Sequence, residues 1–227
     1  MFEEKIWTIK HPVDIIVLPE MFTTGFSMNA QKLAKVHKTR TFKWMQQQAA
    51  QTKAVVIGSA IIKEGEYTYN RLYAVYPDGS FQHYDKKHRF GLAGEDQDYT
   101  AGNNRVTIEV KGWKIMPLIC YDLRFPVWAR SKSSEENLYE YDALIYVANW
   151  PEPRVNAWDA LLTARAIENT SYCIGVNRVG DDGVGAHYVG HSAVYNYKGE
   201  QLAFSEKEEI LYANLTKEDL LAFRKRF

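Results

Sequence analysis

Three reactive side chains each stand where a strand-like run of the sequence ends, and for Lys86 this is the second strand of a predicted hairpin. Glu20 closes D-I-I-V-L-P-E, Lys86 lies in H-Y-D-K-K-H, and Cys120 closes W-K-I-M-P-L-I-C. In open α/β sheets, ligands bind in the crevice outside the carboxyl ends of the strands. An acid, a base and a thiol that converge there would make a nucleophilic site.

The chemistry of amide hydrolysis needs these three groups. A thiol has an ordinary pKa of about 8.5 and is mostly protonated at neutral pH, so Cys120 needs a neighbouring base or positive charge. Glu20 could take the thiol proton and later activate water. Lys86 would stabilise the tetrahedral oxyanion, with the backbone N–H of Tyr121 as a second donor because Tyr121 follows the nucleophile.

Each residue also has an ordinary interpretation when it is taken alone. Cys120 could be a core thiol, Glu20 a solvated loop residue, and Lys86, beside Lys87, part of a charged surface. His88 leaves a Cys–His arrangement open. The large neighbours of Cys120 argue against it, because such sites usually place small residues around the cysteine. The joint occurrence of the three residues in order favours the nucleophilic site.

The apolar patterns predict the elements that must position these residues. Buried strands are expected at 14–20, 54–62, 113–120, 143–150 and 172–179, a last strand at 209–215, hairpins around 77–80 and 198–200, and helices at 2–7, 30–51 and 157–169. Pro117 indicates a bulge or edge position, and Thr216, with Asp219 three residues on, indicates a final helix cap. Cys173 falls within a strand and is expected in the core. The class is α/β, with more strand than a doubly wound sheet.

The composition excludes several classes of protein. The 227 residues carry 28 basic and 28 acidic side chains, so the net charge of zero predicts no nucleic-acid or acidic-membrane partner. No apolar run approaches the roughly 20 residues that span a bilayer, and the start lacks the apolar core of a signal peptide. Two cysteines without a metal-binding spacing predict reduced thiols, no metal site and a cytoplasmic location.

Several motifs in order carry a resemblance to a known family. They are L-P-E-M-F-T-T-G-F, Y-N-R-L-Y-A-V-Y-P-D-G, D-K-K-H-R-F, G-E-D-Q-D-Y-T-A-G, C-Y-D-L-R-F-P, A-N-W-P, A-R-A-I-E-N and N-R-V-G. Together they resemble the nitrilase superfamily of carbon–nitrogen hydrolases, from about Asp14 to Leu215. The superfamily signature is a Glu–Lys–Cys triad in this chain order.

The resemblance implies roles for residues at the matching positions. Glu20 would be the general base, Lys86 the oxyanion stabiliser, Cys120 the nucleophile, and Glu95 a second active-site glutamate that orients Lys86 and substrate. It also implies a four-layer α-β-β-α sandwich with two mixed sheets, a homodimer or higher homo-oligomer, and no cofactor. We expect a single domain over 1–227 that lacks the first family strand and the extreme C-terminus.

Within the superfamily, T-T-G-F-S-M, C-Y-D-L-R-F-P and A-N-W-P are most similar to the omega-amidases. That branch hydrolyses the terminal amide of 2-oxoglutaramate or 2-oxosuccinamate through a Cys thioester, giving a dicarboxylate and ammonia. N-carbamoyl amino acid hydrolase, aliphatic amidase and nitrilase activities remain alternatives.

Further residues are candidates for the pocket or its surroundings. Arg124 could bind the substrate carboxylate or pair with Asp122, and Asn149 and Trp150 could form the pocket wall. Arg89 stands where the family often has leucine, which could alter the pocket mouth or do nothing. Arg165 and Glu168 could form an i,i+3 pair or face a dimer partner.

Overall fold

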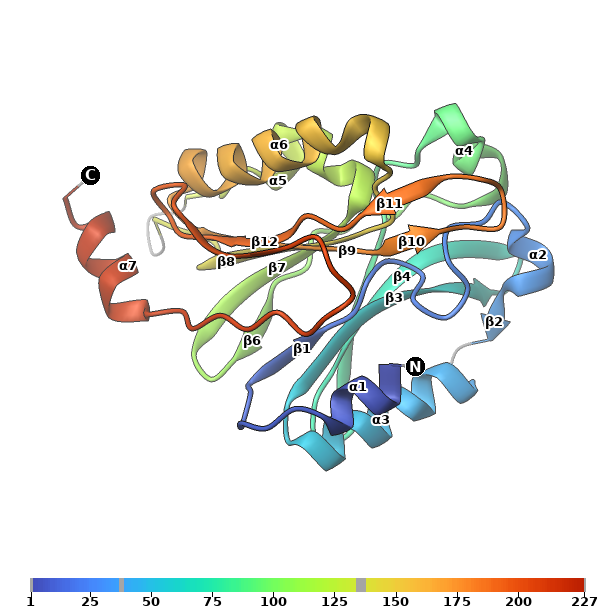
Figure 1. The fold of residues 1–227 in the computed structure, drawn as a ribbon, viewed down its shortest axis with the longest axis horizontal. Helices are drawn as coiled ribbons and strands as arrows, with labels where there is room; N and C mark the ends of the chain where they lie inside the picture. The colour runs from blue at the N-terminus through green and yellow to red at the C-terminus, as the bar shows by residue number, and fades with distance from the viewer. Residues whose placement is uncertain (1, 37–38, 134–137, 227) are drawn as a thin grey trace. The chain divides into compact units, whose positions relative to one another are not determined.

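The computed structural model describes residues 2–36, 39–133 and 138–226, which form two compact units (Figure 1). One unit lies within Met1–Asn104 and the other within Arg105–Phe227. Each unit contains one main β-sheet that is mixed, with both parallel and antiparallel pairs. The prediction of an α/β protein with two mixed sheets is therefore confirmed.

The sheet of the first unit has five strands, in the order β1-β3-β4-β5 with β2 also paired to β3. The strands are β1 (Ile15–Val17), β2 (Lys35–Val36), β3 (Val55–Glu64), β4 (Tyr67–Val75) and β5 (Phe81–Asp85). β1 and β2 run parallel to β3, whereas β3, β4 and β5 are antiparallel neighbours. The predicted strand at 54–62 and the hairpin around 77–80 are confirmed.

Four helices belong to this unit: α1 (Phe2–Trp7), α2 (Ala30–Leu33), α3 (Arg40–Thr52) and α4 (Glu95–Asp98), with a 3₁₀ turn at Gly91–Ala93. α3 packs on β3 and β4 through the buried Phe42, Met45 and Ala49 (Figure 1). The prediction of one helix over 30–51 is wrong. The chain leaves the helix at Ala34 (ψ 137°), and Lys35–Val36 pair with β3 instead. Residues 37 and 38 of the predicted range lie outside the described residues.

The sheet of the second unit has six strands, in the order β13-β12-β9-β8-β7-β6. They are β6 (Ile108–Val110), β7 (Trp113–Ile119), β8 (Ala143–Ala148), β9 (Tyr172–Asn177), β12 (Ser192–Tyr195) and β13 (Gln201–Ser205), and β10 (Val179–Asp181) pairs with β11 (His187–Val189) in a separate hairpin. β7, β8 and β9 are parallel, and β8 is buried along its whole length, which explains its continuous apolar run. The register of β6 on β7 reaches only Ile115, so Pro117 lies beyond the stretch where β6 covers β7.

The helical elements of this unit are η2 (Cys120–Arg124), α5 (Pro126–Ala129), η3 (Glu152–Arg154), α6 (Val155–Glu168) and α7 (Lys217–Arg224). α6 packs on β9 and β12 (Figure 1). Its own side chains Trp158 and Leu162 are buried. The prediction of a strand at 209–215 is wrong, because this segment has no ladder partner and Tyr212 is 47% exposed. Thr216 does stand at the N-cap position of α7, but its side chain makes no capping hydrogen bond.

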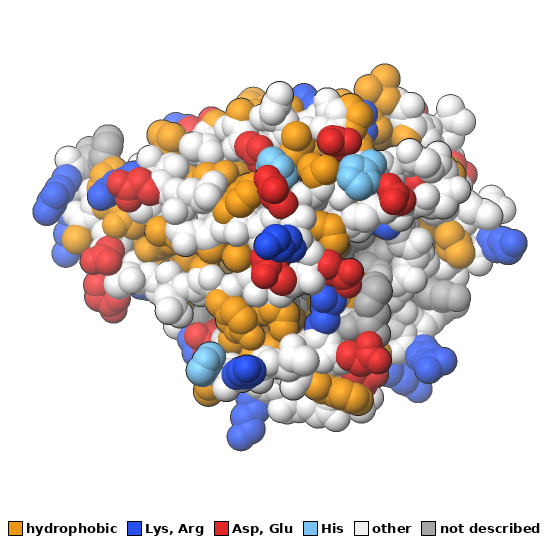
Figure 2. All heavy atoms as spheres, viewed as in Figure 1, with side chains coloured by type: hydrophobic (Ala, Val, Ile, Leu, Met, Phe, Trp, Pro, Cys, Tyr) orange, Lys and Arg blue, Asp and Glu red, His pale blue; other side chains and the backbone are white. Residues whose placement is uncertain are grey.

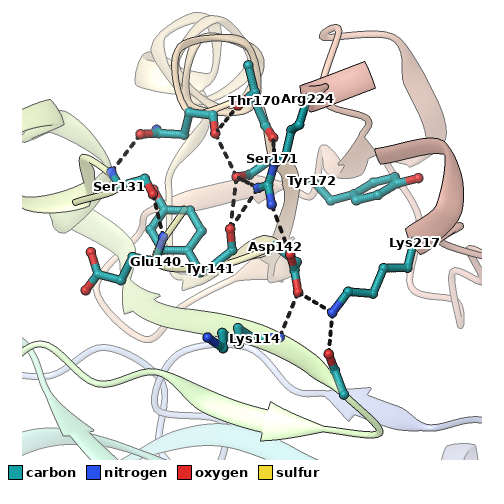
Figure 3. Close-up of polar contacts among 12 residues, drawn as sticks. Lys114, Ser131, Glu140, Tyr141, Asp142, Thr170, Ser171, Tyr172, Lys217 and Arg224 are labelled. Carbon is teal, nitrogen blue, oxygen red and sulfur yellow. Dashed lines mark hydrogen bonds and ion pairs between the residues drawn. The ribbon is translucent and has the colours of Figure 1, made fainter. Parts of the chain in front are cut away.

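A buried polar group anchors α7 to the sheet; we call Tyr141, Asp142, Ser171, Lys217 and Arg224 the Asp142 cluster (Figure 3). The guanidinium of Arg224 donates to Asp142 Oδ1 (3.0 Å), Ser171 Oγ (2.9 Å) and the carbonyl of Tyr141 (2.8 Å). Lys217 Nζ lies 2.9 Å from Asp142 Oδ2. One carboxylate at the start of β8 therefore binds both ends of the helix.

The surface carries no dominant charge on the face that Figure 2 shows, where acidic and basic side chains are interspersed with apolar ones. This distribution agrees with the net charge of zero. Among the described helices, none combines the length and apolar content required to cross a membrane.

Candidate active site

Glu20 lies in a turn that β3 holds in place. The N–H of Leu18 donates to the carbonyl of Ile57 (2.7 Å), and the N–H of Met21 donates to Ser59 Oγ (2.8 Å). Met21 has a φ of 44°, a left-handed conformation that is costly for a residue with a side chain. Pairing with β3 sustains this strain and directs the carboxylate of Glu20 inward, where it is 1% exposed.

Lys86 follows β5 directly and extends its pairing with β4. Its N–H donates to the carbonyl of Asn70 (3.0 Å), and its own carbonyl accepts the N–H of Gly102 (2.9 Å). A Cβ at Gly102 would lie 2.1 Å from the carbonyl oxygen of Asp85, so only glycine allows this approach. The backbone of Lys86 is thus held from both sides, and its side chain is 1% exposed.

Glu95 opens α4 directly after Gly94, whose φ of 79° favours glycine. The N–H of Phe90 donates to Glu95 Oε2 at 2.5 Å. Arg89 Nη1 donates to the carbonyls of Asp96 (3.2 Å) and Tyr99 (2.9 Å). Arg89 therefore holds the helix that carries Glu95 in place. A leucine at this position could not make these two hydrogen bonds.

These elements bring Glu20, Lys86 and Glu95 together with Asn70; we call the four residues the Lys86 cluster. Lys86 Nζ lies 3.0 Å from Glu20 Oε1, and 3.0 and 2.9 Å from the two carboxylate oxygens of Glu95. Asn70 Nδ2 donates to Glu20 Oε1 at 2.7 Å and approaches Glu95 Oε1 at 3.4 Å. Sequence reasoning missed Asn70, although it lies within the motif Y-N-R-L-Y-A-V-Y-P-D-G.

In the Lys86 cluster, the carboxyl groups of Glu20 and Glu95 contact one ammonium group, and all three groups are buried away from water. Burial raises the pKa of Glu95 above its ordinary value, the charge of Lys86 opposes this shift, and the charge of Glu20 adds to it. The ammonium also lies 5.4 Å from the ring centroid of Phe26, a cation–π contact. Glu95 therefore holds a proton more tightly than it would in water.

Cys120, in the second unit, stands at the junction of β7 and η2. It has a φ of 45°, a left-handed conformation, and it is 8% exposed. Asp122 fixes this junction, because its carboxylate accepts the N–H of Ile119 at 3.1 Å. Tyr121 follows in the first turn of η2. Strain of this kind is concentrated at functional sites, where the surrounding structure imposes it.

Arg124 and Trp150 are in contact within the second unit. The guanidinium carbon of the exposed Arg124 lies 5.0 Å from the ring centroid of the buried Trp150. Asn177, at the end of β9, accepts the N–H of Trp150 (2.7 Å) and donates to its carbonyl (2.9 Å). Asn149 is 6% exposed beside it. Arg124 thus lies against the ring of Trp150, whereas the carboxylate of Asp122 accepts the backbone N–H of Ile119.

Two further sequence predictions have clear outcomes. Cys173 is fully buried in β9, where burial raises the pKa of its thiol, so its assignment to the core is confirmed. Arg165 Nη1 lies 2.9 Å from Glu168 Oε1, which confirms the i,i+3 pair.

His88 is partly buried in the first unit. Within the described ranges, no group of three or more His, Cys, Asp or Glu side chains could hold a metal ion.

Comparisons with known proteins identify the family. The carbon–nitrogen hydrolase family model matches residues 5–225. An omega-amidase YafV of Yersinia enterocolitica is 46% identical over 216 residues, covering 94% of this chain and 82% of that protein. A 2-oxoglutaramate amidase of Bacillus subtilis is 34% identical over 203 residues, covering 88% of this chain and 76% of the relative.

Solved structures agree with this match. XC1258 from Xanthomonas campestris, a CN-hydrolase superfamily protein, superposes with a TM-score of 0.96 at 38% identity, covering all of this chain and 86% of the other. Nit3 of Saccharomyces cerevisiae, a nitrilase superfamily member, gives 0.87 at 25% identity, covering 99% and 84%. The chain belongs to the carbon–nitrogen hydrolase family, within the nitrilase superfamily, and is a hydrolase of carbon–nitrogen bonds other than peptide bonds.

Proposed function

We propose that this enzyme is an omega-amidase that hydrolyses the terminal amide of a small omega-amido keto acid, such as 2-oxoglutaramate or 2-oxosuccinamate. The observation that carries this proposal is the buried Glu20–Lys86–Glu95 arrangement, in a chain 46% identical to a named omega-amidase. The products would be a dicarboxylate and ammonia.

The first half of the reaction is acyl transfer to Cys120. Glu20 takes the thiol proton, and the sulfur attacks the amide carbonyl carbon, which becomes tetrahedral with a negative oxygen. The ammonium of Lys86 and the N–H of Tyr121 stabilise that oxyanion. Glu20 then returns the proton to the leaving nitrogen, the carbon–nitrogen bond breaks, and ammonia departs from a thioester.

The second half of the reaction hydrolyses the thioester. Glu20 takes a proton from water, the hydroxide attacks the thioester carbonyl, and the carbon–sulfur bond breaks. The thiolate of Cys120 regains the proton, and the new carboxylic acid leaves. Lys86 Nζ contacts both carboxylate oxygens of Glu95, at 3.0 and 2.9 Å, which supports a role for Glu95 in orienting the ammonium.

Arg124 is proposed to bind the carboxylate at the other end of the substrate. A carboxylate that loses water needs a cation or several donors. Arg124 offers an exposed guanidinium stacked on Trp150, and Asn149 beside Trp150 is proposed to form part of the pocket wall. Because the planar fork of arginine matches a carboxylate, Arg124→Lys should raise KM more than it lowers kcat.

Steady-state release of ammonia tests the proposed substrate class. We expect 2-oxoglutaramate to be hydrolysed with a kcat/KM at least about 100-fold above those of glutamine, carbamoyl-β-alanine and a simple nitrile. A dominant rate with carbamoyl-β-alanine or the nitrile would assign the chain to another branch of the superfamily. No ammonia from 2-oxoglutaramate would refute the proposal.

Intact-mass measurements test the proposed nucleophile. An electrophilic amide analogue should add to Cys120 in the wild type and in Cys173→Ala, but not in Cys120→Ala.

We also propose a homodimer or higher homo-oligomer, which size-exclusion chromatography with light scattering would check. A Glu20→Gln variant that stays active beside an inactive His88→Ala would instead favour Cys–His catalysis.

A further inference from the structure

We infer that Asn70 is a positioning residue of the reaction, whose amide holds the carboxylate of Glu20 against Lys86 and links it to Glu95. This inference rests on the proposed role of Glu20 as the general base. Asn70 Nδ2 lies 2.7 Å from Glu20 Oε1, the same oxygen that Lys86 Nζ contacts at 3.0 Å. Two donors therefore hold one carboxylate oxygen.

The position of Asn70 in the sheet makes it a rigid support. It lies in β4, where Ile61 of β3 is its partner on one side and the N–H of Lys86 donates to its carbonyl on the other. The backbone of Asn70 thus holds the backbone of Lys86, while its side chain holds Glu20. One residue fixes the separation of the proposed base and the proposed oxyanion stabiliser.

The next residue of β4 strengthens this support from the other face, because side chains alternate along a strand. Arg71 makes two contacts with Asp85 of β5, at 2.6 and 2.9 Å, and one with Glu64 of β3, at 2.6 Å. Arg71 thereby ties the three strands together beside Asn70. Asp85 in turn directly precedes Lys86.

The orientation of the Asn70 amide indicates that its donors matter more than its acceptor. Asn70 Oδ1 is buried and, among the described residues, has no hydrogen-bond partner. A buried acceptor in this state is costly. Rotating the amide by half a turn would place the oxygen against the carboxylates of Glu20 and Glu95, which is worse. The amide therefore keeps an unsatisfied oxygen in order to donate to Glu20.

The chemical consequence concerns the charged form of Glu20. A hydrogen bond from a neutral amide stabilises a carboxylate without placing a second positive charge beside the ammonium of Lys86. Without Asn70, the ionised base is less favoured, and its carboxylate can rotate. The loss should appear in kcat and in the acidic limb of the pH–rate profile, rather than in KM.

The test compares Asn70→Ala and Asn70→Asp with the wild type. Asn70→Ala should lower kcat about 30-fold, leave KM within about threefold, and move the acidic limb of kcat/KM upward by about one pH unit. Asn70→Asp keeps the shape but puts a third carboxyl group in the cluster. It should be less active than Asn70→Ala at pH 8 and recover at pH 5 to 6, where a protonated carboxyl can donate again.

Asn196→Ala is the matched control. Asn196 is also a buried asparagine that donates to a glutamate, Glu200 Oε2 at 2.6 Å, but it lies in the turn between β12 and β13. It should lower thermal stability and leave the pH–rate profile unchanged. A merely structural role for Asn70 would give the same pattern as Asn196.

A second readout separates this inference from the proposed substrate. The pH dependence of Cys120 alkylation by iodoacetamide, followed by intact mass, needs no turnover, and it should shift upward in Asn70→Ala. An unshifted profile in both variants, with kcat within about twofold, would overturn the role of Asn70. If the wild type does not hydrolyse 2-oxoglutaramate but the alkylation profile still shifts, the substrate assignment fails and the positioning role stands. Because Asn70→Asp is nearly isosteric, it keeps the test decisive if Asn70→Ala does not fold.

Discussion

The Lys86 cluster and the Asp142 cluster are buried charge groups of opposite composition. The Lys86 cluster has two carboxyl groups around one cation, whereas the Asp142 cluster has two cations around one carboxylate. In the first, burial raises the pKa of Glu95, and an amide oxygen has no partner among the described residues. In the second, the guanidinium of Arg224 donates to four separate acceptors: Asp142 Oδ1, Ser171 Oγ and the backbone carbonyls of Tyr141 and Thr170.

The difference separates the proposed reactive site from a structural anchor. The Lys86 cluster combines a raised pKa of Glu95, an amide oxygen without a partner among the described residues and a strained backbone at Met21, all of which cost stability and suit proton transfer. The Asp142 cluster neutralises its charge with several donors and docks a helix. The comparison teaches that burial of charge alone does not indicate a catalytic group, whereas a raised carboxyl pKa together with backbone strain and an unsatisfied polar atom does.

The largest effect should come from breaking the Lys86 cluster at its cation. Lys86→Met removes the proposed oxyanion stabiliser and leaves two buried carboxyl groups facing each other, so turnover should fall about 10⁴-fold. Ammonia release from 2-oxoglutaramate measures this loss. Lys87→Met is the control, because Lys87 contacts Asn103 in a solvent-exposed pair. A Lys86→Met enzyme within tenfold of wild type would remove the chemical distinction between the two clusters.

The corresponding break in the Asp142 cluster should act on stability. Arg224→Ala leaves Asp142, Ser171 and the Tyr141 carbonyl without their main donor, which should lower the free energy of unfolding by about 3 kcal/mol. Urea denaturation measures this change, and turnover per folded molecule should stay within twofold. Arg224→Lys, which keeps the charge but not the fork, should lose less. A large fall in kcat with unchanged stability would make this cluster functional.

The proposed catalytic residues could be selected from the sequence, but the residues that support them could not. Glu20, Lys86 and Cys120 were proposed because each stands at the end of a predicted strand and has a reactive side chain. Asn70 has no such chemistry alone, and its role depends on the register that places Arg71 opposite Asp85. The strain at Cys120 likewise depends on the sheet that holds it.

The errors in the predicted fold also arise from strand pairing between segments that are distant in the sequence. The helical pattern over 30–51 is interrupted because Lys35–Val36 pair with β3, a partner that follows them by more than two dozen residues. The run at 209–215 has the composition of a strand but pairs with no strand in the described part of the chain. Strands such as β3 and β8 were predicted correctly. They are buried along most of their length, so nearly every position in them carries an apolar or small residue.

The raised pKa of Glu95 predicts a pH effect that the Asp142 cluster should lack. Because the folded state holds this proton more tightly than the unfolded chain, the stability it contributes is fully present below about the ordinary value of 4.5 and is lost as pH rises through the raised pKa. Glu95→Gln cannot lose a proton. Relative to wild type, it should gain about 1.4 kcal/mol per pH unit inside that window.

Urea unfolding of both proteins at several pH values from 4 to 8 measures this trend. Glu66→Gln, in the exposed turn between β3 and β4, is the control for loss of a surface glutamate. A stability gain of Glu95→Gln over wild type that falls as pH rises would contradict the raised pKa of Glu95 and the difference it makes between the two clusters.

The smallest effect should come from the second cation of the Asp142 cluster. Lys217 contacts Asp142 Oδ2 at 2.9 Å, but its side chain is 30% exposed, so solvent screens the pair. Lys217→Ala should therefore lower the free energy of unfolding by only about 0.5–1 kcal/mol, and less at high salt. In the double variant with Arg224→Ala the two losses should not add, because both cations neutralise one carboxylate. If Lys217→Ala costs as much as Arg224→Ala, the anchor depends on net charge rather than on the fork of donors that distinguishes it from the Lys86 cluster.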